Sequence, residues 1–178
     1  GSTVHLPDWI EKDAHFSSPQ HRVWLRRRLG GLFGNGRPLV MILHNPSTAG
    51  VDSDDPTSRR GIGFAHTLGY SELVFVNAAT AIATDANDLV SHPDPIGPMA
   101  DEALHVAAEF CRQRDGILVA AWGSAKGRAR TRALMEERFA HIRQMGLPLH
   151  ALRLTAGGSP EHPLYLPKDL VPFLWDPH

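Results

Sequence analysis

The residues best suited to chemistry stand where apolar or extended segments of this chain end. They are His44, Asn45, Asn77 and His162. An imidazole can act as an acid, a base or a stabiliser near neutral pH, and an amide offers a donor and an acceptor together. That amide pair suits the Watson–Crick edge of a pyrimidine. His44, Asn45 and His162 are therefore catalytic candidates, and Asn77 is the candidate for reading a nucleobase.

Neighbouring polar and aromatic residues complete the candidate site. Base contact is expected from Pro46, Ser47 and Trp122. Contact with phosphate or nucleic acid is expected from Arg59, Arg60, Ser124, Lys126, Leu164 and Tyr165. The Leu-Tyr pair would be an exposed apolar wedge able to enter a base stack. Each feature also has a structural interpretation: residues 45–48 fit a turn equally well, Asn77 fits a satisfied turn amide, and Trp122 and the wedge can pack on the core.

An acidic segment follows the first of these clusters and contains Asp52, Asp54 and Asp55. Three carboxylates could hold a divalent cation, but the glycine and the glutamate of an EF-hand loop are missing. Turn formation and helix capping are more frequent roles, and Asp55 before a proline is the best cap for a helix near 57–68. We expect no structural metal and no cofactor, and a cation at these aspartates stays an open alternative.

The elements that must position these residues alternate along the chain. Apolar runs predict strands at 38–43, 72–77, 116–121 and 148–154, and helical spacing predicts helices at 20–29, 57–68, 98–114 and 125–144. This alternation predicts an α/β fold, a three-layer sandwich with a mainly parallel, four-stranded central sheet. Residues 1–19 are expected to form an irregular segment and residues 20–178 a single domain. In such sheets the site lies beyond the carboxyl ends of the strands.

The composition is typical of a globular chain, with 42% hydrophobic and 21% charged residues and a net charge of −1. The single cysteine, Cys111, cannot form an internal disulfide, and its apolar neighbours favour a buried thiol. No apolar run reaches the ~18 residues that cross a membrane, so we expect a cytoplasmic protein without a membrane partner. Basic residues cluster at 22–28, 59–60 and 126–132, as phosphate-binding faces or as solvated surfaces. Dinucleotide, phosphate-loop and nucleophile-elbow motifs are absent.

Two resemblances rest on ordered segments of the chain. Segments 45–49, 54–57, 59–60, 63–65, 76–77, 83–85, 121–123 and 162–167 resemble a bacterial family of unknown function, the one numbered 1643. More distantly, His44-Asn45-Pro46-Ser47, 76–83, 118–123 and His162-Pro163-Leu164 are similar to motifs of the uracil-DNA glycosylase superfamily. Leu164 stands where that superfamily has serine, and Ser47 where it has glycine or tyrosine.

The second resemblance implies a uracil-DNA-glycosylase-like fold and a role for each residue. Asn45 or His44 would position the attacking water, Asn77 would read the base, His162 would stabilise the departing base, and the wedge that starts at Leu164 would help extrude the nucleotide. We therefore expect recognition of a nucleobase in DNA or another nucleobase-containing ligand, with hydrolysis of the N-glycosidic bond. Two alternatives stay open: an enzyme acting on a free nucleoside or nucleotide, and a non-catalytic base-binding module.

Overall fold

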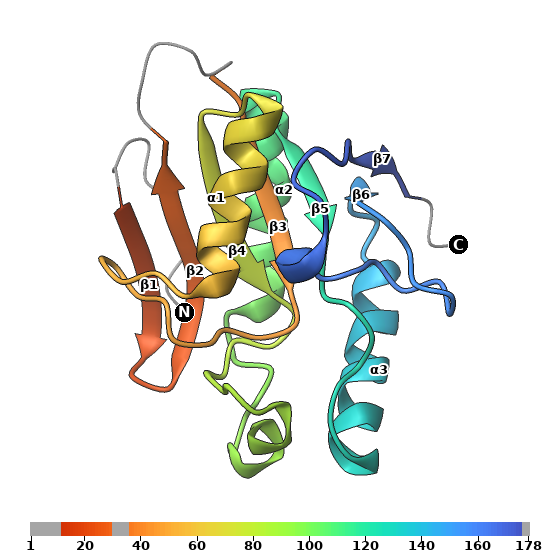
Figure 1. Ribbon diagram of the computed structural model, residues 1–178. Coiled ribbons are helices and arrows are strands. Elements are labelled where there is room, and N and C mark those ends of the chain that lie inside the picture. The colour runs from red at the N-terminus through yellow and green to blue at the C-terminus, as the bar shows by residue number, and fades with distance from the viewer. Residues whose placement is uncertain (1–11, 30–35, 176–178) are drawn as a thin grey trace.

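The chain folds around one large sheet (Figure 1). The computed structural model describes residues 12–29 and 36–175, and the part of the predicted irregular segment at 1–11 lies outside them. Within these residues seven strands form a sheet in the order β1-β2-β4-β3-β5-β6-β7. The strands are β1 (Lys12–Ser18), β2 (His21–Arg28), β3 (Pro38–Leu43), β4 (Glu72–Asn77), β5 (Ile117–Ala120), β6 (Leu149–Ala151) and β7 (Phe173–Leu174). The α/β class is confirmed, whereas the predicted four-stranded sheet is too small.

The middle of the sheet is parallel. β4 pairs with β3, β3 with β5 and β5 with β6 in parallel, whereas β1, β2 and β7 are attached antiparallel. Every residue of β3 and β4 is buried, as expected for strands that are covered on both faces. The four parallel strands are those that the apolar runs predict. Because they are parallel, their carboxyl ends meet at one edge of the sheet.

Two predictions about the N-terminal part of the chain are wrong. Residues 20–29 contain β2 rather than a helix, and residues 12–18 form β1 rather than an irregular segment. The arginines of β2 do not form a solvated helix face, because most of them are buried. Arg26, for example, forms an ion pair of 2.5 Å with Glu72 of the neighbouring strand. Such a pair makes a buried cation tolerable, and its partner is 46 residues away in sequence.

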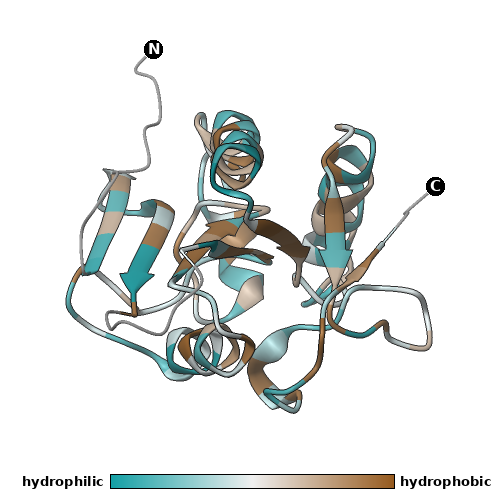
Figure 2. Cartoon of the chain, turned by 90° about the horizontal axis from the view of Figure 1, so that it is seen from above, coloured by the Kyte–Doolittle hydropathy of each residue, from teal (hydrophilic) through white to brown (hydrophobic). Residues whose placement is uncertain are grey.

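Helices cover both faces of the sheet. In the described part of the chain they are α1 (Pro56–Leu68), α2 (Ala100–Arg114) and α3 (Ala129–Arg143), with short 3-10 turns η1 (Ala86–Ser91) and η2 (Pro163–Tyr165). α1 packs with Leu39 and Met41 on one face, and α2 and α3 pack with Val40 and Ile42 on the other (Figure 2). Cys111 is buried in α2, as predicted. None of these helices is long and apolar enough to cross a membrane.

The start of α1 is fixed as the sequence predicts. Asp55 caps the helix, because its side chain accepts the backbone N–H of Ser58 at 2.8 Å and Pro56 occupies the first turn. Gly61 brings the helix close to the sheet, since a Cβ atom there would lie 2.6 Å from Cζ of Phe75 on β4. These two features place the first turn of α1 over the carboxyl edge of the parallel strands.

Candidate functional site

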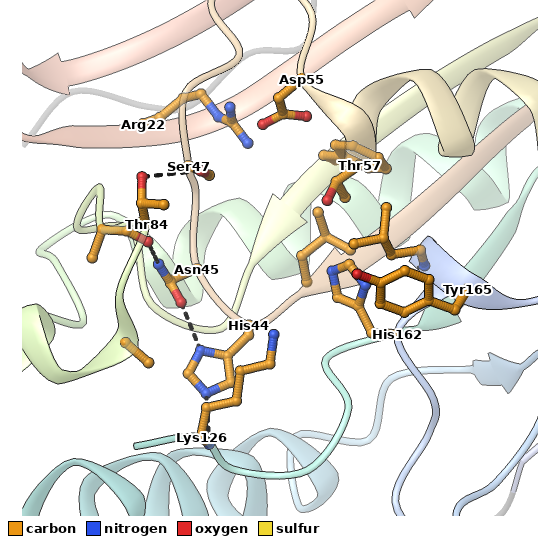
Figure 3. A pocket seen from close by; sticks show the side chains of 15 residues that line it. Arg22, His44, Asn45, Ser47, Asp55, Thr57, Thr84, Lys126, His162 and Tyr165 are labelled. Atoms are coloured by element: carbon orange, nitrogen blue, oxygen red, sulfur yellow. Dashed lines mark hydrogen bonds between the residues drawn. The ribbon is translucent and has the colours of Figure 1, made fainter. Parts of the chain in front are cut away.

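A pocket of about 360 Å³ opens at the carboxyl end of β3 (Figure 3). The predicted site residues that line it are His44, Asn45, Ser47, Lys126, His162, Leu164 and Tyr165. They come from the segment after β3, from the segment after β5, and from the turn at η2. The fold thus brings together three segments that are far apart in sequence.

His44 and Asn45 form a fixed pair on the wall of the pocket. Nδ2 of Asn45 donates to the carbonyl oxygens of Ala83 at 2.7 Å and of Pro46 at 3.1 Å. Oδ1 is therefore the atom that lies 2.7 Å from Nδ1 of His44, and Nδ1 must carry the proton. Nε2 of His44 then accepts the backbone N–H of Lys126 at 3.3 Å. Both ring nitrogens are occupied, whereas Oδ1 of Asn45 keeps one lone pair for a water or a ligand.

His162 offers the opposite function, a hydrogen-bond donor. Its Nδ1 accepts the backbone N–H of Leu164 at 3.2 Å, so the neutral ring carries its proton on Nε2. Nε2 has no hydrogen-bond partner among the residues that the structure describes. The segment is held by the end of β5, because the N–H of Gly123, at φ 72°, donates to the carbonyl of Pro160 at 2.8 Å.

Both imidazoles of the pocket are uncharged at neutral pH. Burial lowers the pKa of His44 from 6.5 to about 4, against the hydrogen bond with Asn45, which raises it. Burial likewise lowers the pKa of His162 to about 4, with further contributions from the charge of Lys126 and from His44. The charged side chains in the lining are therefore Lys126 and two others that come from β2 and from the cap of α1.

Sequence reasoning missed the pocket residues Arg22, Asp55 and Thr57, of which the first two are charged. Figure 3 shows Arg22 and Asp55 facing each other across one end of the pocket, with Thr57 beside them. Arg22 is 2% exposed, and its Nη1 donates to the carbonyl of Ala49 at 2.6 Å. The basic run and the Asp-Pro-Thr cap are visible in the sequence, but only the strand pairing of β2 shows that they meet.

Asn77 does not line the pocket. Its side chain is 1% exposed at the end of β4, and neither amide atom has a hydrogen-bond partner among the described residues. A buried polar group without a partner costs about 1–3 kcal/mol. Strand alternation places Asn77 on the same face as Phe75, which does line the pocket. Asn77 is thus buried close to the pocket but is not part of its wall.

Other predicted residues also lie outside the pocket lining: Pro46, Trp122, Ser124, Arg59 and Arg60. Trp122 is buried and stacks on Phe139, with ring centroids 5.2 Å apart. Trp122 and Ser124 border a separate cavity of about 330 Å³. Arg59 bonds to a backbone carbonyl of the preceding loop, and Arg60 bonds to the carbonyl of Leu166. Arg60 therefore ties α1 to the segment that carries the rim of the pocket.

The acidic segment is engaged within the protein. Arg27 forms an ion pair with Asp54 at 2.9 Å, and this pair and the hydroxyl of Ser58 lower the pKa of Asp54 despite its partial burial. The carboxylate of Asp55 accepts two backbone N–H groups, and Asp52 is exposed. No group of three potential metal ligands occurs within residues 12–29 and 36–175.

Comparison with known proteins gives a family and no closer relative. No curated protein and no solved structure matches the chain significantly. A family described as protein of unknown function, DUF1643, matches residues 22–164, a range that contains the pocket residues described above except Tyr165. The chain belongs to the family DUF1643, as its ordered motifs predict.

Proposed function

We propose that the pocket binds a nucleobase-bearing ligand and hydrolyses its N-glycosidic bond. The observation that carries this proposal is one spare acceptor and one spare donor in the same pocket. They are Oδ1 of Asn45 and the Nε2–H of His162. Hydrolysis of this bond needs both, an acceptor that orients the attacking water and a donor that receives the charge of the departing base.

Asn45 is suited to orienting water because its amide is held in place. Both hydrogens of Nδ2 donate to backbone carbonyls, and the third contact is the N–H of His44 on Oδ1. A water that donates to the remaining lone pair of Oδ1 keeps its own lone pair free to attack the sugar carbon. His44 has no free nitrogen and a pKa of about 4, so its role is to fix Asn45 rather than to take the proton.

His162 is suited to stabilising the leaving base. As the carbon–nitrogen bond breaks, its electron pair passes to the base, while the water oxygen bonds to the sugar carbon. The proton that this water loses ends on the base anion, which then leaves as the neutral free base. A neutral imidazole with a fixed N–H stabilises such a developing anion by hydrogen bonding. It keeps its proton, so it does not have to be reprotonated after each turnover. The ammonium group of Lys126, in the same pocket, adds positive charge.

The rim of the pocket supports a ligand that extends beyond it. Tyr165 is 89% exposed, and Figure 3 shows its ring beside His162. An exposed aromatic ring can stack on a base, which contributes about 1–3 kcal/mol for each base. The wedge formed by Leu164 and Tyr165 could therefore hold or extrude a neighbouring nucleotide.

A basic surface adjoins the pocket at Lys126, which is one of the lining residues. Lys126, Arg128, Arg130 and Arg132 are exposed around the start of α3, where the helix dipole is positive and acidic residues are usual. Cations at this position raise the local positive potential and would attract a phosphate backbone. This surface favours a nucleic acid as the ligand.

A second candidate function is an enzyme that acts on a free nucleotide. The observation that favours it is the buried guanidinium of Arg22 in the pocket wall, which suits a terminal phosphate. The two candidates differ in the salt dependence of binding. Binding of a polymer should weaken steeply with salt, and binding of a mononucleotide only slightly.

The test is mass spectrometry of free bases after incubation with single-stranded oligonucleotides, duplexes and mononucleotides that carry a panel of damaged or deaminated bases. Release from oligonucleotides supports the first candidate, and release from mononucleotides alone supports the second. Release should be strongly slowed in His162→Ala but kept at the wild-type rate in His105→Ala, a control at an exposed histidine of α2. Binding without release from any substrate would contradict hydrolysis.

A further inference from the structure

We propose that Arg22 forms an anion subsite in this pocket, which binds a phosphate group of the nucleotide ligand. The inference rests on the proposed function for the identity of the ligand, and on the structure for the subsite itself. The bound phosphate group could be the terminal phosphate of a mononucleotide or a phosphodiester of a nucleic-acid backbone, because both present the same acceptor oxygens.

Among the buried arginines of β2, Arg22 lacks the carboxylate partner that the other two have. Arg26 has the carboxylate of Glu72 at 2.5 Å, and Arg27 has that of Asp54 at 2.9 Å. Arg22 is equally buried, yet it forms no ion pair with any described residue, and its Nε has no hydrogen-bond partner among them. A buried charge normally requires a partner. Arg22 is also the member of this group that lines the pocket.

The surroundings of Arg22 complete a site for an anion. The side chain of Thr57, in the first turn of α1, lies at the same end of the pocket in Figure 3 and makes no hydrogen bond there with the described residues. Asp55 acts on Arg22 electrostatically but forms no ion pair or hydrogen bond with it, and its oxygens accept the backbone N–H groups of Ser58 and Ala49. With both histidines neutral, Arg22 and Lys126 outnumber this single carboxylate.

A phosphate fits this arrangement better than a neutral group. The guanidinium of arginine presents several N–H donors in a planar fork that matches phosphate oxygens, and a threonine hydroxyl can donate to a further oxygen. The subsite would lie at the end of the pocket away from Lys126 and His44, with Asn45 between the two ends (Figure 3). It would therefore hold the phosphate while the sugar and base lie toward Asn45 and His162.

The experiment measures binding of four probes by calorimetry: inorganic phosphate, a deoxynucleoside, its 5′-monophosphate and the corresponding dinucleoside monophosphate. The monophosphate or the phosphodiester should bind at least about tenfold more tightly than the nucleoside. Arg22→Gln should abolish this preference, Thr57→Val should reduce it, and Arg112→Gln, at an exposed arginine of α2, should leave it unchanged. Tighter binding of the monophosphate would identify a terminal phosphate as the ligand group, and tighter binding of the dinucleoside monophosphate would identify a backbone phosphodiester.

Equal affinity of the wild-type protein for the nucleoside and both phosphorylated probes would overturn the inference, as would a full preference in a folded Arg22→Gln variant. If that variant does not fold, Thr57→Val decides, because threonine and valine have the same shape and an unchanged preference would again overturn the inference. Base release is scored separately. Release without a phosphate preference removes only the subsite, and a phosphate preference without release removes only the hydrolysis.

Discussion

The two neutral histidines of the pocket should make the protein sensitive to mild acid. His44 and His162 have a pKa of about 4 in the folded chain, compared with the ordinary value of 6.5. Their contribution to stability is fully present above pH 6.5, where both states are neutral. It is lost as the pH falls from 6.5 toward 4, because the unfolded chain then binds protons that the folded chain excludes.

The magnitude follows from these values. The gap between 6.5 and about 4 is about 2.5 pH units, and each unit corresponds to about 1.4 kcal/mol, so each histidine can contribute at most about 3.5 kcal/mol. Lowering the pH from 7 to 5 should remove about 2 kcal/mol for each of them. That is a large fraction of the ~5–15 kcal/mol that stabilise a typical domain. The lowered pKa values of Asp54 and Asp101 act in a different window, below pH 3.8.

The assay is urea unfolding of the wild-type protein and of His162→Gln at pH 7 and at pH 5. The glutamine side chain cannot titrate, so the variant should lose about 2 kcal/mol less than the wild type between the two pH values. The difference between the two proteins at pH 7, where His162 is neutral in both states, measures the effect of the substitution on packing and hydrogen bonding alone. An equal loss in both proteins, or an NMR titration of His162 centred near 6.5, would refute the reasoning.

Three further predictions concern single positions. Gly61→Ala should lower the free energy of unfolding by about 1–3 kcal/mol in urea titrations, because its Cβ would lie 2.6 Å from Phe75; an unchanged value would show that α1 can move away freely. Asp54→Asn should lower the free energy of unfolding by about 2 kcal/mol at pH 7, because the substitution leaves the buried guanidinium of Arg27 without a carboxylate. The loss should be smaller below pH 3.8, and an equal loss at both pH values would contradict this reasoning. Tyr165→Ala should leave the melting temperature unchanged and weaken binding of single-stranded oligonucleotides by about 1–3 kcal/mol in fluorescence titrations, and unaltered affinity would remove the stacking role.

The parallel strands and the start of α1 could be predicted from local sequence. The continuous apolar runs of β3 and β4 have the length and composition of strands buried on both faces. The cap at Asp55 is a local device, in which a side chain bonds to a backbone N–H three residues later. These features are visible in the sequence because they need no knowledge of the rest of the chain.

The arginine-rich strand β2 could not be predicted in the same way. Its basic residues look like a solvated helix face until the partners of Arg26 and Arg27, Glu72 and Asp54, are known. Because a helix was predicted at 20–29 in place of β2, Arg22 was not included in the candidate site. A helix there would not have placed Arg22 against α1. Long-range pairing therefore decided both the secondary structure and the charge of the pocket.

The position of Asn77 shows a similar limit. Its place at the end of β4 could be predicted, but whether a side chain at a strand end reaches the pocket depends on what covers it. Here the amide is buried with no partner among the described residues, while Phe75 on the same face is the residue that lines the pocket. The position of a residue along a strand can be predicted from the local sequence. Its exposure cannot, because exposure depends on segments that are distant in the sequence.

Single-turnover base release tests most directly whether Asn45 and His162 act together on one bound ligand. With a substrate identified by mass spectrometry, Asn45→Ala and His162→Ala should each slow release by about 10²–10³-fold while changing ligand affinity far less, because both side chains act mainly in the transition state. His105→Ala should match the wild type. Wild-type rates in both folded pocket variants, or no release by the wild-type protein from any ligand it binds, would contradict the account.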